Sequence, residues 1–331
     1  MLYLIISFII SLLVSMVIIY YSHKHQIFMD NHDSDKPQLF HDNATPRSGG
    51  IGIIIGLLPF IFSIFGIKLL IPTILAFISG IFEDFHNSLS ATTRLILQSV
   101  ASIMAIWLLN AYVSYLGLGI YLPLWFAYIF TTFVIVGMMN AINIIDGFNG
   151  LASGVTLLIL LSFGYISYSE NNQELLKIIL ITIGAILGFI ILNFPKGKIF
   201  LGDGGAYLLG FVVAIIGIFL SNKYDTVSPW YVLAVLIYPV WEVLFSIIRK
   251  LSLKKSPLKP DSYHFHMLVF RVLAKNNPLT AIFIVSLNMP FIYFATIHAH
   301  NSLYNIKIIT LFILLYVSLY FYLLRKDKTI S

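Results

Sequence analysis

The sequence predicts an all-α fold, a polytopic membrane bundle of helices, and three observations support this prediction. Hydrophobic residues make up 59% of the 331 residues and charged residues only 10%, with a mean hydropathy of +0.92, whereas a soluble domain carries about 25% charged residues. Apolar segments of about 20 residues, long enough to cross a bilayer as a helix, recur along the whole chain. Since lipid offers the backbone no hydrogen bonds, only helices and closed barrels cross it, and segments this long favour helices. We therefore expect one integral membrane domain over residues 1–331.

Hydropathy predicts eleven transmembrane spans, with ten as the alternative. The second and third spans are separated only by "FGIKLLIP", a very short turn. The expected spans lie at 2–20, 49–66, 68–82, 95–112, 122–142, 151–168, 176–193, 205–220, 230–248, 280–298 and 305–324.

The distribution of basic residues predicts how the chain is oriented in the membrane. If the N-terminus is outside, 16 of the 20 lysines and arginines fall on the inner side. The positive-inside rule therefore places the N-terminus outside and the C-terminus inside, and it explains the net charge of +6 without a nucleic-acid partner. The chain has no cysteine, which excludes disulfides, thiolate metal sites and cysteine nucleophiles. The inner loops expected to carry the polar chemistry are 21–48, 83–94, 143–150, 194–204 and 249–279.

The first inner loop combines His41 and Arg47 with a Gly49–Gly50 pair that opens the second span, in "DKPQLFHDNATPRSGGIGI". Backbone N–H groups at a helix start and an arginine fork both suit an anionic group. The alternative is an ordinary juxtamembrane loop that ends in a basic residue.

An acidic pair, Glu83 and Asp84, ends the third span in "GIFEDFHNSLS". Adjacent carboxylates at a membrane edge can hold a hard cation through oxygen ligands, often with bound waters. Taken alone, the pair is better explained as a solvated helix end.

Polar residues three apart occupy "MNAINIIDGFNGLASG", between two spans. Asn140, Asn143, Asp146 and Asn149 recur at a spacing that brings neighbours together on a helix. Polar side chains in so apolar a setting are costly, which favours a functional role.

Asp203 in "IFLGDGGAYLLGF" is followed by Gly204–Gly205 and a new helix. Its position near a positive helix end also fits a simple capping aspartate. Phe200, Lys196 and Lys198 lie just upstream on the same side. We expect Mg²⁺ to compensate the charge of Asp203 and the glycines to leave room for a phosphate.

The longest inner loop contains His264 and His266 after Asp261. Because the chain has no cysteine and many carboxylates, these histidines suit phosphate binding or orientation better than metal binding. Glu242, the one acid well inside a span, either lines a substrate groove or pairs with a polar group on a neighbouring helix.

In this order, "TPRSGGIGI", "EDF", "NAINIIDGFNGLASG", "FLGDGGAYLLGF" and "HFHM" resemble the polyprenyl-phosphate N-acetylhexosamine-1-phosphate transferases. That superfamily also contains the phospho-MurNAc-pentapeptide translocase of peptidoglycan synthesis. The resemblance covers nearly the whole chain. It implies Mg²⁺-dependent transfer of a sugar-1-phosphate from a UDP-sugar to undecaprenyl phosphate, with release of UMP. Mn²⁺ is the expected substitute for Mg²⁺.

The resemblance also implies roles for individual residues. Asp203 is implied as the metal ligand, with Asp84 as a further candidate ligand. The implied catalytic residues are Glu83, Asp84, Asp146, His264 and His266. The implied substrate-binding residues are His41, Arg47, Asn143, Asn149, Lys196 and Phe200, the last stacking on uracil.

Three departures from the family pattern leave the donor sugar open. Glu83 replaces the usual first aspartate of an Asp-Asp pair, Asn149 replaces a second acid, and Met267 ends the histidine motif. The implied donors are UDP-GlcNAc or a deoxy-aminosugar relative, used for lipopolysaccharide O-antigen, capsule or a similar glycan. The implied setting is the bacterial inner (plasma) membrane with the site facing the cytoplasm, and a homodimer stays open. The alternatives are the pentapeptide transferase itself and a membrane transporter.

Overall fold

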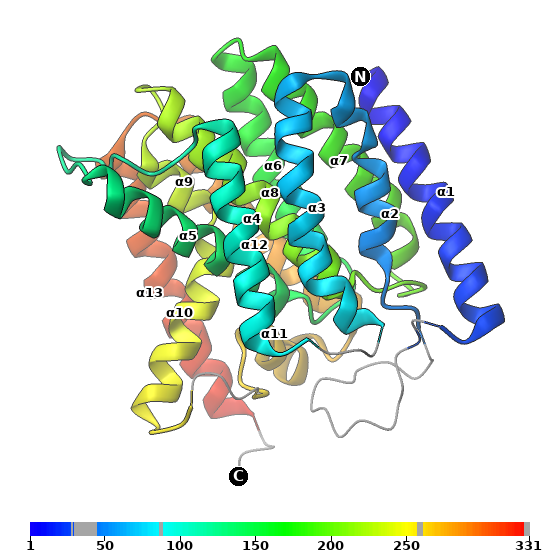
Figure 1. The fold of residues 1–331 in the computed structure, drawn as a ribbon. Helices are drawn as coiled ribbons and strands as arrows, with labels where there is room; N and C mark the ends of the chain where they lie inside the picture. Colours follow the sequence, from blue (N-terminus) through cyan, green and yellow to red (C-terminus); the bar gives the residue numbers. More distant parts are fainter. Residues whose placement is uncertain (28, 30–44, 86–88, 257–260, 328–331) are drawn as a thin grey trace.

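The computed structural model describes residues 1–27, 29, 45–85, 89–256 and 261–327, and this part of the chain is helical (Figure 1). Outside helices, its only β pairings are the isolated bridges Met29–Pro46 and Tyr115–Tyr121. The elements are α1 (Leu2–His25), α2 (Gly49–Gly56), η1 (Leu58–Phe62), α3 (Ile64–Asp84), α4 (Ala91–Leu109), α5 (Leu124–Ile145), α6 (Leu151–Ser169), α7 (Gln173–Asn193), α8 (Gly202–Lys223), α9 (Pro229–Val235), α10 (Ile237–Ser252), α11 (Phe265–Val269), η2 (Phe270–Ala274), α12 (Asn277–Ile297) and α13 (Ser302–Lys326). The expected all-α bundle is confirmed.

The number of spans differs from the eleven expected. Within the described ranges, nine helices are long and apolar enough to cross a membrane, or ten if the bent pair α9–α10 counts as one span. The expected span 49–66 is instead the shorter apolar stretch Gly49–Phe62, in which α2 ends and Pro59 opens the 3-10 helix η1. A new helix then begins because the Ser63 side chain caps α3, accepting the Gly66 N–H at 2.9 Å.

The expected span 230–248 is broken into α9 and α10, which meet at 77°. Pro239 lies in the first turn of α10 and has no N–H to donate to Val235, the last residue of α9. Its ring also crowds that carbonyl, so a continuous helix is disfavoured at this point. The break turns α10 away from the direction of α9, and the histidine loop follows the far end of α10.

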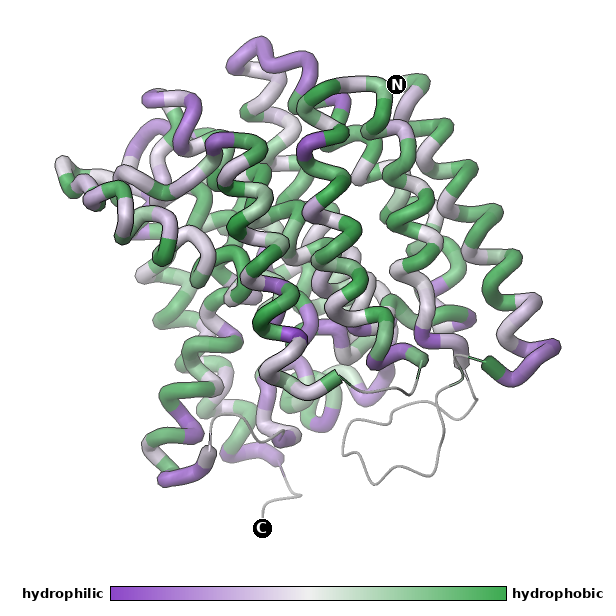
Figure 2. Tube along the Cα trace, in the orientation of Figure 1, coloured by the Kyte–Doolittle hydropathy of each residue, from purple (hydrophilic) through white to green (hydrophobic). Residues whose placement is uncertain are grey.

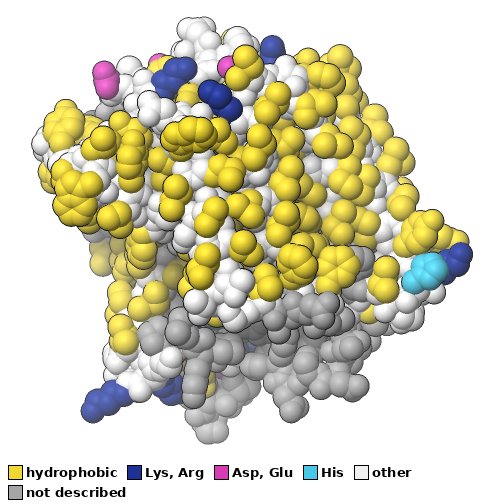
Figure 3. All heavy atoms as spheres, viewed as in Figure 1, with side chains coloured by type: hydrophobic (Ala, Val, Ile, Leu, Met, Phe, Trp, Pro, Cys, Tyr) yellow, Lys and Arg dark blue, Asp and Glu magenta, His cyan; other side chains and the backbone are white. Residues whose placement is uncertain are grey.

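Apolar side chains cover the outside of the bundle between two more polar ends. Figure 2 shows hydrophobic residues along the helices and hydrophilic residues at their ends, and Figure 3 shows the same apolar band on the surface. Trp107 and Phe133 are 80% and 71% exposed, which suits a lipid contact and would be costly in water. The chain is a multi-pass membrane protein.

The central helix is α8. In its apolar 18-residue stretch 89% of the residues are buried, compared with 17% in the corresponding stretch of the peripheral α1. Glycines bring its first turn very close to α2 and α3. A Cβ on Gly205 would lie 2.9 Å from the Gly50 Cα, and a Cβ on Gly80 would lie 2.5 Å from the backbone of Asp203 and Gly204. Gly204 and Gly205 were expected to leave room for a phosphate. In the structure they instead allow α8 to pack closely against α2 and α3.

Candidate active site

The start of α2 and the start of α8 are joined through their backbones. Phe200 N donates to Pro46 O at 2.8 Å, Gly49 N to Phe200 O at 2.8 Å, and Gly50 N to Leu201 O at 2.9 Å. These bonds place Arg47, just before α2, beside the first turn of α8. Two of the expected loops are thereby brought together.

Asp84, the last residue of α3, caps the N-terminus of α8. Its Oδ1 accepts the Asp203 N–H at 3.0 Å, and its Oδ2 accepts the Gly204 N–H at 3.2 Å. Asp84 is buried, and a negative group at a helix N-terminus is favoured by the helix dipole. Gly202 has φ +76°, and a Cβ there would lie 2.6 Å from Asp84 Oδ2, so glycine is required for this approach. Asp84 therefore holds the backbone that carries Asp203.

Asp203 lies between two arginines, one just before α2 and one in the first turn of α4. Its carboxylate is 3.8 Å from Arg47 Nη2 and 3.4 Å from Arg94 Nη1, and Arg94 also lies 3.7 Å from Glu83 Oε2. These four side chains are partly exposed, so the cluster can be reached from outside. Arg94 was missed as a site residue in the sequence. The signal was a single arginine in the first turn of the helix that follows the acidic pair.

The turn after α5 brings Asp146 into the same electrostatic environment. Burial raises the pKa of Asp146 to about 7, while Arg47 lowers it and Asp203 raises it. Asp146 N donates to the Asn143 carbonyl at 3.2 Å, which closes this turn. Asp146, Asp203 and Arg47, which come from three separate segments, therefore lie close enough to influence one another electrostatically.

Asn149 is buried in a set of structural contacts. Its Nδ2 donates to the Pro195 carbonyl at 3.1 Å, and its backbone N–H donates to Asn277 Oδ1 at 2.8 Å. Next to it, Gly150 N donates to Asn193 Oδ1 at 2.7 Å. These contacts tie the Asp146 turn to the loop before α8 and to α12, and they engage the Nδ2 of the amide expected to bind substrate.

Glu242 orients the histidine loop. Its Oε1 lies 3.1 Å from His264 Nδ1 and accepts the Phe265 N–H at 3.0 Å, and its Oε2 accepts the Tyr316 hydroxyl at 3.0 Å. Glu242 is 1% exposed. Of the two roles considered for this acid, pairing with a polar group of another element is confirmed.

A second ion pair fixes the segment just before the histidines. Arg249 holds Asp261 through two hydrogen bonds of 2.9 and 3.1 Å, the bidentate geometry typical of arginine with a carboxylate. Asp261 also accepts the Tyr263 N–H at 3.2 Å. The chain entering the loop is thus held from α10.

His266 links this loop to the Asp146 turn. Its ring stacks parallel to His264 at 5.4 Å, meets Phe148 edge-on at 5.8 Å, and would lie 3.4 Å from a Cβ on Gly147. The residue is fully buried, and neither ring nitrogen has a hydrogen-bond partner within the described ranges. Burial lowers its pKa to about 4, so the ring is neutral near pH 7.

The remaining expected residues are placed less specifically. Phe200 is partly buried and shares its backbone bonds with the start of α2, while Lys196 is exposed. Asn143 is partly buried at the end of α5. His41 lies outside the described residues.

The side chains fit a magnesium ion bound with its substrate better than one held in a preformed cage. Mg²⁺ usually takes one or two carboxylates, with waters and substrate phosphates as its other ligands. Within the described ranges, no three acidic or histidine side chains form a metal cluster. Asp203 is held only loosely by arginines, whereas both oxygens of Asp84 already accept backbone N–H groups. Asp203 is thus the better candidate ligand of the two.

The fold and the site define a class of protein. It is a multi-pass membrane protein with a carboxylate–arginine centre, formed by Arg47, Glu83, Arg94 and Asp203, at one end of its bundle. Residues 66–221 match the family model described as Glycosyl transferase family 4. Undecaprenyl-phosphate N-acetylglucosaminyl 1-phosphate transferases are similar over 80% of this chain, a probable one from Bacillus subtilis at 32% identity (77% of its own length) and one from Thermotoga maritima at 31% (79%). A phospho-N-acetylmuramoyl-pentapeptide-transferase of Streptococcus agalactiae is 29% identical over 70% of this chain and 69% of its own.

The chain belongs to glycosyl transferase family 4. The family and these relatives indicate a sugar-phosphate transferase that acts on a polyprenyl phosphate. The expected resemblance is confirmed.

Proposed function

We propose that this protein transfers an N-acetylhexosamine-1-phosphate, with GlcNAc-1-phosphate as the first candidate, from a UDP-sugar to undecaprenyl phosphate and releases UMP. The observation that carries the proposal is the cluster of Arg47, Glu83, Arg94 and Asp203 at one end of a lipid-facing bundle. Two substrates with phosphates, one of them anchored in lipid, need a polar centre at such an end. The names of the relatives support the acceptor and the transferred group.

In the proposed reaction an oxygen of the lipid phosphate attacks the β-phosphorus of the UDP-sugar. The bond from that phosphorus to the bridging oxygen breaks, and UMP leaves with that oxygen. A phosphate monoester has its second pKa near 6, so the lipid phosphate is mostly dianionic at pH 7 and needs no strong base. The main task of the protein is to bring two anions together.

The arginines are suited to this task. Arg47 and Arg94 are held by Asp203 and Glu83 at distances of 3.4 to 3.8 Å, longer than strong charge-assisted hydrogen bonds. These contacts with the acids are long enough for a diphosphate to compete with the carboxylates for both arginines. Mg²⁺, when bound at Asp203, supplies further neutralisation of phosphate charge.

Asp84 and Glu242 act as positioning residues in this proposal. Asp84 fixes the turn that carries Asp203, and Glu242 fixes the Nδ1 side of His264. The other nitrogen of His264 faces Asp261 Oδ1 at 3.8 Å, too long for a hydrogen bond, and we assign to this nitrogen the role of orienting a phosphate. Asn149 supports the Asp146 turn rather than contacting substrate.

We place the site at the cytoplasmic face of the bacterial plasma membrane. The carboxylate–arginine centre lies on inner segments in the orientation favoured by the basic residues. UDP-sugars are made in the cytosol, and the lipid phosphate presents its head at the membrane surface. O-antigen, capsule or a similar envelope glycan is the proposed destination of the product.

Transfer of phospho-MurNAc-pentapeptide is the second candidate function, because relatives of that name align with the chain. The test is to incubate the purified full-length protein with undecaprenyl phosphate, Mg²⁺ and either UDP-GlcNAc, other UDP-N-acetylhexosamines or UDP-MurNAc-pentapeptide. We expect UMP with UDP-GlcNAc or a related amino sugar, only when lipid phosphate and metal are both present. Release of UMP from UDP-MurNAc-pentapeptide and from no other donor would select the second candidate. Absence of UMP release with every donor would refute both.

A further inference from the structure

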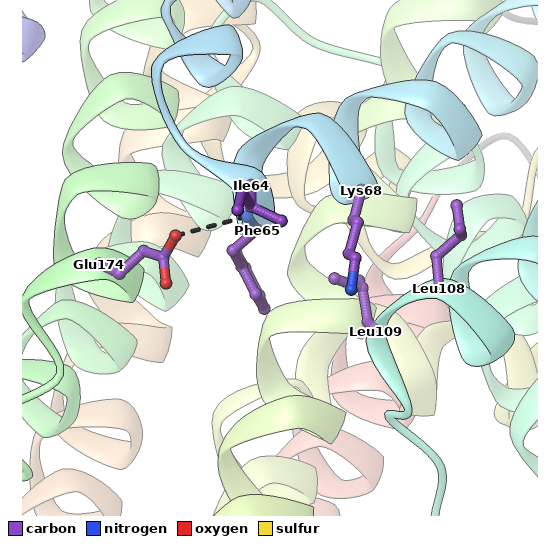
Figure 4. A pocket seen from close by; sticks show the side chains of 6 residues that line it. All are labelled: Ile64, Phe65, Lys68, Leu108, Leu109 and Glu174. Carbon is purple, nitrogen blue, oxygen red and sulfur yellow. Dashed lines mark hydrogen bonds between the residues drawn. The ribbon is translucent and has the colours of Figure 1, made fainter.

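A pocket of about 440 Å³ lies between the ends of α3, α4 and α7 (Figure 4). It is lined by Ile64, Phe65, Lys68, Leu108, Leu109 and Glu174. Ile64 is the first residue of α3 and Asp84 is the last. The pocket is thus separated from the carboxylate–arginine centre by the length of that helix, roughly 30 Å at 1.5 Å per residue. It is a separate site at the opposite end of the bundle, and its volume is within the range of about 300–1,000 Å³ common for ligand pockets.

The pocket contains one cation and one anion that do not pair with each other. Lys68 comes from α3 and Glu174 from the first turn of α7, and no ion pair joins them in the described part of the chain. In Figure 4 they lie on opposite sides of Phe65, with Lys68 next to Leu109. Among the residues that the structure describes, Glu174 Oε1 accepts only the Phe65 N–H, at a long 3.4 Å. Both charges are therefore free to contact a ligand that carries two opposite charges.

The surroundings of the pocket are apolar. Ile64, Leu108 and Leu109 supply aliphatic walls, and Phe65 packs edge-on against Phe219 of α8 at 4.8 Å. The pocket lies where the apolar outer surface of the bundle gives way to charged residues, as the upper rim in Figure 3 shows. In a membrane this is the depth of the lipid headgroups. The ligand most available there is a phospholipid.

We propose that this pocket binds a zwitterionic phospholipid whose headgroup carries a primary amine. The lipid phosphate contacts Lys68, the ammonium contacts Glu174, and the upper acyl chain lies against Ile64 and Leu108. Glu174 gives the selectivity, because a carboxylate beside the phosphate disfavours an anionic headgroup that brings no amine. The bound lipid would join α3 and α4, which carry Asp84 and Arg94 at their other ends.

The test measures lipid retention by native mass spectrometry on the full-length protein in detergent. Phosphatidylethanolamine and phosphatidylglycerol with identical acyl chains are added at equal concentration. A partly exposed ion pair is worth about 0.2–1 kcal/mol, so we expect a preference for phosphatidylethanolamine of about 1.4- to fivefold. Glu174→Gln should remove the preference, and Lys68→Gln should weaken the binding of both lipids.

Lys307→Gln is the matched control, because Lys307 is an exposed charge on α13 outside the pocket lining. It should leave both lipids unchanged. Equal retention of the two lipids by the unmodified protein would overturn the proposal, as would a preference that survives Glu174→Gln. Retention of neither lipid would overturn it as well. The measurement uses no sugar nucleotide, so its outcome is independent of the proposed transferase activity.

Discussion

Asp84→Asn tests whether the second acid of the pair acts as a helix cap. Both carboxylate oxygens accept backbone N–H groups of the first turn of α8. The asparagine keeps one acceptor and turns an NH₂ group towards the other donor. Hydrogen bonds to a charged group contribute about 1.5–3 kcal/mol each, and neutral ones about 0.5–1.5 kcal/mol. Relief of the buried charge offsets part of the difference, so we expect unfolding to become easier by about 2 kcal/mol.

The same substitution should lower turnover, because the turn of α8 that carries Asp203 loses its anchor. A misplacement of about 1 Å at a reacting centre can cost about 100-fold in rate. Denaturation in detergent micelles measures the stability change, and single-turnover UMP release measures the rate. Glu83→Gln is the matched control. It removes the neighbouring acid, whose only described ion pair is with Arg94 at 3.7 Å, and such a pair is worth about 0.2–1 kcal/mol.

Either of two patterns of results would refute the capping role of Asp84. If Asp84→Asn unfolds like the unmodified protein but loses activity, with the acid limb of the pH–rate profile gone, the carboxylate acts as a base. If both stability and turnover are unchanged, the two hydrogen bonds have no consequence.

Three further predictions concern packing, protonation and charge. Gly205→Ala places a methyl group 2.9 Å from the Gly50 Cα and should cost about 1–3 kcal/mol of stability, whereas Gly137→Ala, with nothing within 4 Å, should be neutral in the same denaturation assay. The pKa of His266 is lowered to about 4 from 6.5, so only the unfolded state gains its proton as pH falls from 6.5 to 4. Stability should therefore fall over that window, and His266→Gln should reduce the fall measured by thermal denaturation. Arg94→Lys keeps the charge but loses the fork between two acids, and we expect kcat/KM for UMP release to drop about tenfold; an unchanged value would remove Arg94 from the site.

The helical membrane architecture and the identity of the polar loops could be predicted because they depend on local composition. Long apolar runs define spans, and basic loops define an orientation. The segment broken near Pro239 and the short segment Gly49–Phe62 were each predicted as a continuous span. Hydropathy averages over about 20 residues and is therefore insensitive to a single proline. Such breaks depend on individual backbone hydrogen bonds.

The partners within the site could not be predicted from the sequence because they come from distant segments. Asp84 and Asp203 are adjacent only because Gly80 and Gly202 let the backbones of α3 and α8 approach. Arg94 follows the acidic pair in the next helix, and only folding directs it to Asp203 as well as to Glu83. The sequence therefore singled out the acids as candidates, and the structure adds which groups each acid contacts.

The most direct test of the proposed reaction follows the β-phosphate of the donor. UDP-GlcNAc labelled with ³²P at that position is incubated with undecaprenyl phosphate, Mg²⁺ and the full-length protein, and the products are separated into lipid and aqueous phases. The account predicts that the label moves to the lipid phase with one equivalent of UMP, and that Asp203→Asn abolishes this transfer. Label that stays in the aqueous phase as UDP while the sugar reaches the lipid would contradict sugar-1-phosphate transfer, and full activity of Asp203→Asn would contradict the role of the carboxylate–arginine centre.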